Sequence, residues 1–163
     1  MLFLVQGLGR SAAFASVIFA VVAVTAIAAA LVGGGLADRV GFRRLVVPAV
    51  VVYGLGALVP ALTQAPIVVV AIAPLAFAAA RVMSLSFAWL ARLTAHEGHG
   101  LAAGLYGLSQ GAGIIFGPAL AGIAVELARP VLPGTEGYAT IFVVAAVAGL
   151  ASVPFVARVP EGA

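Results

Sequence analysis

The sequence predicts an all-α fold, a polytopic transmembrane helical bundle of about five spans that forms a single domain over residues 1–163. Hydrophobic residues make up 64% of the chain and charged residues 8%, whereas a soluble domain averages about 25% charged residues. The apolar residues occur in runs long enough to cross a bilayer, which takes about 20 helical residues. Period-2 alternation is absent and alanine is abundant, so membrane β-barrel strands are not expected.

The spans follow from four runs without a charged residue, at 11–37, 45–80, 100–125 and 137–157. The second run is too long for one helix and breaks at residues 60–66, where two prolines and two polar side chains make a turn. Its second half continues through Arg81 to about Leu93. The expected spans are therefore 12–36, 44–63, 67–93, 99–127 and 138–157, and residues 1–7 are an apolar stub that forms the end of a truncated helix.

The distribution of arginine predicts the orientation, because cytoplasmic loops carry an excess of Lys and Arg. On one side, Arg10 and Arg129 flank a charge-free turn around Gln64. The connections on the other side hold Arg39, Arg43, Arg44, Arg92 and Arg158. The side with more arginines is expected to be cytoplasmic, and the C-terminus is on that side. The expected location is the cell (plasma or inner) membrane.

Composition also argues against several other functions. The net charge is +3, but the arginines are scattered between apolar runs and form no basic stripe for nucleic acid. The chain has no cysteine, hence no disulfide framework and no thiolate metal site. No nucleotide-binding loop occurs, so neither a cofactor nor drive by ATP is expected.

The connection between the first two spans carries the most specific motif. Glycines at 33–35 let a neighbouring helix approach closely, and Gly41 supplies the backbone freedom of a tight turn. Asp38 and Arg39 can pair across that turn, and two further arginines can anchor it at anionic headgroups. The alternative is a short loop with ordinary cytoplasmic arginines. The motif residues are Gly34, Leu36, Asp38, Arg39, Gly41, Arg43 and Arg44.

The segment Gly34-Gly35-Leu36-Ala37-Asp38-Arg39-Val40-Gly41-Phe42-Arg43-Arg44-Leu45 resembles motif A of the major facilitator superfamily, G-x-L-A-D-R-x-G-R-R/K-x-x-L. Phe42 departs from it, standing where that family usually has a basic residue. In the family the motif lies between helices 2 and 3 and, more loosely, between helices 8 and 9. Its Asp braces a helix of the opposite half in one conformational state. The resemblance therefore gives Asp38 the role of a gate latch.

The fourth span resembles motif C of the same family, through Gly104, Gly113, Gly117, Pro118 and Gly122, with Ala121 replacing one glycine. That motif is best known in helix 5 of proton-coupled antiporters, and similar patterns occur in helix 11. The family has twelve helices in two halves. The ending 137–142, a last helix and then 159–161 resembles the C-terminal half, which identifies the chain as helices 8–12, with helices 2–6 as the alternative. The resemblance implies that a first half lies outside the chain.

Two faces of the fourth span differ in character at 100° per residue. Tyr106 and Gln110 lie beside Gly113 and Gly117, and are candidate substrate contacts. The alternative for Gln110 is a hydrogen bond to another helix. A stripe of small residues on a different face is expected to pack against another helix, and consists of Gly100, Gly104, Gly107, Gly111, Pro118 and Gly122.

Arg81 lies in mid-span, where a charge costs about 2.5 kcal/mol or more, so it is expected to face the bundle interior or a cavity. Ser84 shares its side of the helix. An Arg in helix 4 is a family feature (motif B) used in proton coupling, but the expected Q-G after it is absent here. The candidate cavity or coupling residues are Arg81, Ser84, Tyr106 and Gln110, and a buried ion pair with the other half is the alternative for Arg81.

Two patterns suggest chemistry that the sequence does not support. Residues 107–111 satisfy G-x-S-x-G, but a hydrolase needs this turn between a strand and a helix. His96, Glu97 and His99 lack a fourth metal ligand and indicate a solvated turn. No catalytic residue and no metal site is therefore expected, and the chain is not expected to be an enzyme.

The sequence and the resemblance together favour a secondary active transporter that exports or imports a small organic solute by alternating access. The resemblance implies proton coupling, but no carboxylate lies in mid-span, so either the missing half carries the coupling group or the protein is a uniporter. The expected partners are the lipid bilayer, a small-molecule substrate and either a missing N-terminal half or a second copy. A multi-pass scaffold or subunit without transport is the alternative.

Overall fold

The computed structural model describes residues 3–63, 67–94 and 98–161, and every regular element within these ranges is helical. The predicted all-α class is therefore confirmed. The helices begin and end close to the predicted spans, except that α1 continues four residues further, through most of the expected connection. The elements are η1 (Phe3–Gly7), α1 (Ala12–Val40), α2 (Phe42–Leu62), α3 (Ile67–Leu93), α4 (His99–Ala128), η3 (Pro133–Thr135) and α5 (Thr140–Val156).

The helices match the needs of a chain in lipid. Hydrocarbon offers no partner for backbone N–H and C=O groups, and a helix satisfies both within itself. Helices α1, α2, α3 and α4 are long and apolar enough to cross a membrane, whereas α5, with 17 residues, is apolar but shorter. That all five cross as one domain stays a prediction.

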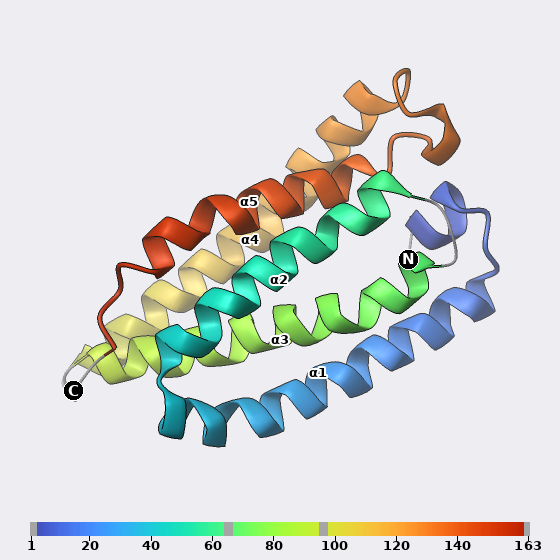
Figure 1. The fold of residues 1–163 in the computed structure, drawn as a ribbon. Helices are drawn as coiled ribbons and strands as arrows, with labels where there is room; N and C mark the ends of the chain where they lie inside the picture. The colour runs from blue at the N-terminus through green and yellow to red at the C-terminus, as the bar shows by residue number, and fades with distance from the viewer. Residues whose placement is uncertain (1–2, 64–66, 95–97, 162–163) are drawn as a thin grey trace.

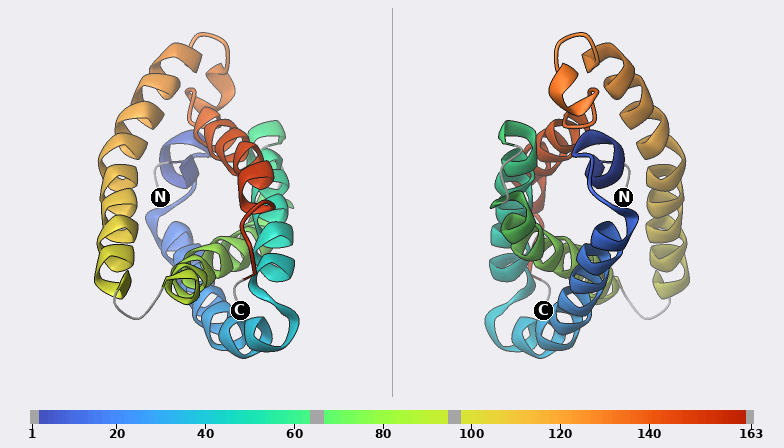
Figure 2. Two further views of the ribbon diagram at one scale, coloured as in Figure 1. Left: turned by 90° about the vertical axis from the view of Figure 1, so that its left-hand side faces the viewer. Right: turned by 90° about the vertical axis from the view of Figure 1, so that its right-hand side faces the viewer.

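Helix α2 lies at the centre of the bundle. The four helices α5, α2, α3 and α1 lie side by side in that order (Figure 1), with α2 contacting both α5 and α3 extensively and α1 packing on α3. Helix α4 lies apart from this group (Figure 2) and makes fewer contacts, with α5 and α3. Contacts across the bundle are thus concentrated on α2 and α3.

Small residues allow this close packing. A Cβ at Gly54 of α2 would lie 2.6 Å from Leu150 Cγ of α5 and 3.3 Å from the Leu150 backbone nitrogen. A Cβ at Gly149 would lie 3.1 Å from Tyr53 Cδ1. Lipid tails are as apolar as leucine, so helices in a bilayer associate through close van der Waals contact, which small residues permit. The α2–α5 pair is held in this way.

Buried side chains gather at opposite ends of the bundle. At one end Phe3 of η1 packs edge-on against Phe142, with ring centroids 4.7 Å apart. The Tyr138 hydroxyl donates to Gln6 Oε1 and ties η1 to the segment before α5. At the other end Leu85 and Trp89 of α3 pack among residues from the end of α1 and the start of α2. This second cluster supports the motif A segment.

The α2–α5 contact predicts a local effect of Gly54→Ala. The added methyl overlaps the Leu150 side chain and approaches its backbone, so we expect a loss of about 1–3 kcal/mol in the stability of the folded chain. The readout is the midpoint of thermal unfolding in detergent. Gly113→Ala is the matched control, because nothing lies within 4 Å of its Cβ position. Equal midpoints for the two variants would contradict the close α2–α5 packing.

Candidate functional site

The motif A segment forms a sharp helix–helix corner with one residue between helices. Helix α1 ends at Val40 and α2 begins at Phe42. Gly41 between them adopts φ of +100°, which strains any residue with a side chain, and its N–H donates to the Ala37 carbonyl at 3.0 Å. Gly34, Leu36, Asp38 and Arg39 therefore lie on the last turns of α1, and Arg43 and Arg44 lie on the first turn of α2.

Asp38 forms an ion pair with α3 rather than with its neighbour. Arg92 Nη2 lies 2.6 Å from Asp38 Oδ1, and the two side chains are 51% and 58% exposed. The expected Asp38–Arg39 pair is therefore wrong for this structure. Consecutive helical residues point about 100° apart, and with α1 helical to Val40 the two side chains diverge. The carboxylate links the ends of α1 and α3.

Phe42, the departure from motif A, joins an aromatic stack. Its ring lies 6.5 Å from the Trp89 ring at an interplanar angle of 20°, and the Arg92 guanidinium carbon lies 4.9 Å from its centroid. An arginine over an aromatic face gains a cation–π interaction. Phe42 thus holds Arg92 where Asp38 reaches it, a role that a basic residue could not fill.

The segment after α5 returns to this corner. Trp89 Nε1 donates to the Pro160 carbonyl at 2.9 Å, and the Arg43 backbone N–H donates to Glu161 Oε2 at 3.2 Å. Arg43 also donates through Nη1 to the Ala157 carbonyl at 3.4 Å. The sequence indicated only that 159–161 resemble the end of the C-terminal half. The apolar-flanked Pro160-Glu161 pair after the last span was the available signal for a docked acid.

Together these residues form a polar cleft at one end of the bundle. Its lining comes from α1, α2, α3 and the C-terminal segment, and includes Asp38, Arg43, Arg44, Arg92 and Glu161. The arrangement is a set of ion pairs and hydrogen bonds between helix ends, with no partner buried deeply. Such contacts can form and break as helices shift.

A comparison with family models supports the interpretation of this corner as motif A. The model described as Major Facilitator Superfamily matches residues 1–162. The chain belongs to this superfamily. A comparison with curated proteins and one with solved structures found no significant match. The superfamily is a family of membrane transporters, so the chain is an integral membrane protein whose surroundings are the bilayer and whose family acts on small molecules.

Arg81 of this superfamily member lies in a groove between α1 and α2. It shares the groove with Thr25 of α1 and Arg44 of α2. Its guanidinium carbon lies 4.8 Å from the Phe77 ring centroid, and its Nε is buried without a hydrogen-bond partner among the described residues. The structure thus places Arg81 between helices, as its charge requires in lipid.

The other three candidate cavity residues do not join Arg81 in that groove. The Tyr106 hydroxyl donates to the Met83 carbonyl of α3 at 2.8 Å and accepts from Gln110 Nε2 at 3.1 Å. The Ser84 hydroxyl donates to the Arg81 carbonyl at 3.4 Å. Tyr106 therefore links α4 to α3, whereas Gln110 donates to Tyr106 of its own helix, so the alternative of a direct bond from Gln110 to another helix stays a prediction. A role in substrate contact stays a prediction.

The small-residue face of α4 meets no helix within the described residues. Nothing lies within 4 Å of a Cβ built at any glycine of this face. The same holds for Gly34 on α1, whereas Gly33 lies 3.6 Å from Leu85 of α3. That this face packs against a helix thus stays a prediction, and the helix would have to come from outside the described residues. The open α4 positions are Gly100, Gly104, Gly107, Gly111, Gly113, Gly117 and Gly122.

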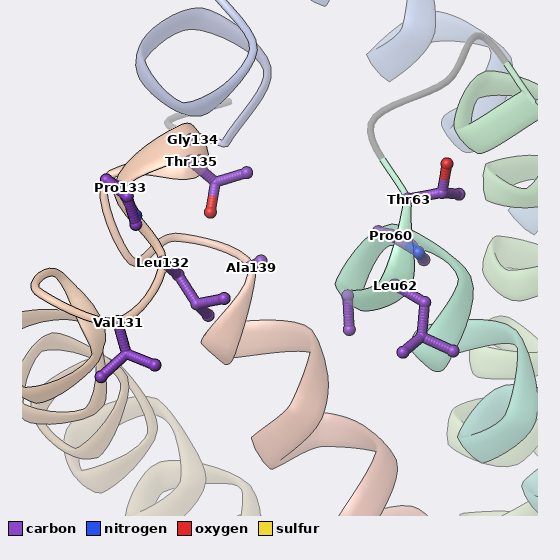
Figure 3. A pocket seen from close by; sticks show the side chains of 10 residues that line it. Pro60, Leu62, Thr63, Val131, Leu132, Pro133, Gly134, Thr135 and Ala139 are labelled. Carbon is purple, nitrogen blue, oxygen red and sulfur yellow. The ribbon is translucent and has the colours of Figure 1, made fainter.

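The far end of the bundle holds a second cleft, of about 470 Å³. It lies between the end of α2 and the η3 segment, with Thr63 and Thr135 on opposite sides (Figure 3). The Thr135 hydroxyl is buried without a hydrogen-bond partner among the described residues. Nearby Glu126 and Arg129 pair at 3.3 Å on the exposed end of α4. None of the described residues that line this cleft is charged.

The structure bears on the two sequence patterns that suggested a hydrolase or a metal site. Ser109 lies inside α4, and its hydroxyl donates to the Tyr106 carbonyl at 2.8 Å. Gln64, His96 and Glu97 lie outside the described residues. Within 3–63, 67–94 and 98–161, no three His, Cys, Asp or Glu side chains come together to hold a metal ion.

The docked C-terminal segment predicts a result for Trp89→Phe. Phenylalanine keeps the stack on Phe42 but loses the donor to Pro160, which costs about 0.5–1.5 kcal/mol. We expect a glutamate-specific protease to cleave after Glu161 about 2- to 10-fold faster. Cleavage after Glu136, in the exposed η3 region, is the internal reference, and Phe116→Leu on α4 is the control variant. Unchanged cleavage after Glu161 would mean that the indole does not hold this segment.

Proposed function

We propose that the chain is one half of a secondary active transporter that moves a small organic solute by alternating access, with coupling to protons. Within it the chain supplies the C-terminal half, helices 8–12, and η1 is the end of the preceding helix. In such transporters one half rocks against the other around a site near the midplane. The wall contributed here would include Arg81.

The observation that carries the proposal is the motif A corner. Asp38 and Arg92 are about half exposed, and an ion pair in that setting contributes about 0–1 kcal/mol. A latch must be this weak, because two conformations exchange readily only when they differ by a few kcal/mol. We infer that Asp38 binds Arg92 in one state and a helix of the opposite half in another.

Orientation and partners belong to the same proposal. The arginine excess around the motif A corner supports a cytoplasmic location for it, and hence for the C-terminus. The membrane would be the plasma or inner membrane. The open small-residue face of α4 supports a partner half, supplied either by a preceding segment or by a second copy. The direction of transport is left open, and no catalytic activity is proposed.

The competing function is a multi-pass scaffold or subunit without transport. A scaffold function accounts for the apolar helices as well as a transport function does. It gives no reason for an arginine in mid-span whose Nε finds no partner among the described residues. A scaffold would gain from an apolar residue there, since a charge inside the membrane is costly.

The latch predicts a loss of flux in Asp38→Asn. The change removes the Arg92 pair, and we expect flux to fall about fivefold or more, the equivalent of about 1 kcal/mol. Membrane vesicles that contain the assembled protein are given a mixture of small organic solutes and a pH gradient, and uptake and release are measured by mass spectrometry. Glu126→Gln is the matched control, because it also breaks an exposed ion pair but at the other end of the bundle.

Arg81→Leu in the same assay separates the two functions. A transporter should lose flux, whereas a scaffold should be unchanged or more stable. If no solute moves in wild-type vesicles that contain both halves, transport is wrong. If Asp38→Asn and Glu126→Gln behave alike, motif A does not act as the latch.

The partner half predicts protection of Ile115, which lies on the small-residue face of α4 and is 69% exposed in this chain. The chain has no cysteine, so Ile115→Cys introduces a single reporter. We expect a lipid-soluble maleimide to label it slowly in the assembled protein, because a helix covers it. Val147→Cys on α5, which is 61% exposed, should label fast. Equal labelling in the membrane would show that the α4 face is open to lipid.

A further inference from the structure

We propose that the groove between α1 and α2 binds an anionic phospholipid, whose headgroup phosphate lies between the guanidinium groups of Arg44 and Arg81. The groove encloses about 470 Å³. Helix α3 forms its floor, and the two other helices form its walls. Arg81 also belongs to the proposed transport wall, but lipid binding in this groove requires no flux. Its lining includes Thr25, Arg44, Pro48, Val52, Phe77 and Arg81.

The charge of the groove is unbalanced. Two arginines line it, and none of the described residues of its lining is a carboxylate. The acidic side chains that the structure places near other charges are engaged elsewhere, Asp38 with Arg92 and Glu126 with Arg129. Glu161 accepts from the Arg43 backbone at the motif A corner. Because Arg81 lies in mid-span, where a charge without a partner is costly, the groove favours an anionic occupant.

Arg81 lines this groove and has unused hydrogen-bonding capacity. Its guanidinium carbon stacks 4.8 Å from the Phe77 ring, which fixes the plane of the group. Its Nε is buried and has no acceptor among the described residues. A guanidinium presents several N–H donors in one plane and binds phosphate with two of them at once. Because the Nε is buried, a phosphate in the groove would bind through the terminal guanidinium nitrogens of Arg81.

The remaining lining is suited to hydrocarbon and is open to the bilayer. Besides the arginines and Thr25, the groove is lined by apolar side chains, and Val52 at its edge is 47% exposed. Helix α3 lies between α1 and α2, whereas α4 lies on the far side of the bundle (Figures 1 and 2). A lipid can therefore enter sideways without crossing the bundle. These features favour a membrane lipid over a soluble anion.

Native mass spectrometry of the full chain tests the proposal. The detergent-solubilised protein is titrated with phosphatidylglycerol or phosphatidylcholine of identical acyl chains. We expect tighter binding of phosphatidylglycerol, by about fivefold for each arginine that contacts the headgroup. Arg44→Gln and Arg81→Gln should each lower this preference about fivefold. Arg158→Gln is the matched control, because Arg158 lies after α5 and does not line the groove.

Two further arms keep the test decisive. Cross-linking with a photoactivatable phosphatidylglycerol on wild-type protein should label peptides covering 44–52 and 73–81, even if Arg81→Gln fails to fold. Arg81→Lys keeps the charge and should retain part of the preference. Equal binding of both lipids, or a preference that survives both glutamine variants, would overturn the proposal. Glycerol phosphate or inorganic phosphate displacing the lipid at similar concentration would instead assign the groove to a soluble anion.

Discussion

The solvent imposes the constraint on which the whole structure depends. Hydrocarbon accepts no backbone hydrogen bonds, so each crossing segment must be helical. It also removes the hydrophobic driving force between helices, so packing depends on how closely the backbones approach. Helix α2 meets this condition on two sides, with Gly54 against Leu150 of α5 and Gly56 against Leu75 of α3. The positions of α3 and α5, and through α3 that of α1, follow from α2.

The polar groups are arranged around this apolar frame. The ion pairs between described residues lie at helix ends, and so does the hydrogen bond of Glu161. Arg81 is the charged residue that lies in mid-span. The motif A corner collects the ends of three helices and the segment after α5. Each single contact there is weak, but the aromatic stack of Phe42 and Trp89 under Arg92 orients the charged groups. The corner is therefore ordered without being strongly bound, which suits a contact that has to open.

Much of the fold could be predicted from the sequence, because helix length in lipid is set by bilayer thickness and by charges and prolines. The predicted limits of 67–93 and 99–127 lie within one residue of α3 and α4. The motif A residues were identifiable by their order. The partner of Asp38 was not, because pairing with Arg92 depends on how α1 and α3 approach in space, 54 residues apart. Docking of Glu161 was missed for the same reason. The separation of Arg81 from Tyr106 depends on helix rotation, which hydrophobicity in an almost uniformly apolar helix does not specify.

Helix α4 shows how packing and the proposed mechanism are connected. It is apolar enough to cross the membrane, yet it contacts its neighbours lightly and joins α3 through hydrogen bonds of Tyr106. Hydrogen bonds of this kind contribute about 0.6 kcal/mol on average between membrane helices. No described atom lies within 4 Å of a Cβ built at its glycines, which permit the closest approach of another helix. A helix at the boundary between two rocking halves has to change its contacts with the opposite half. Tight packing against that opposite half would prevent the change, whereas packing against its own half would not. In the proposed transporter, the glycines of this face carry no side chains that would interlock with a partner helix, so such a helix could shift over them with little steric cost.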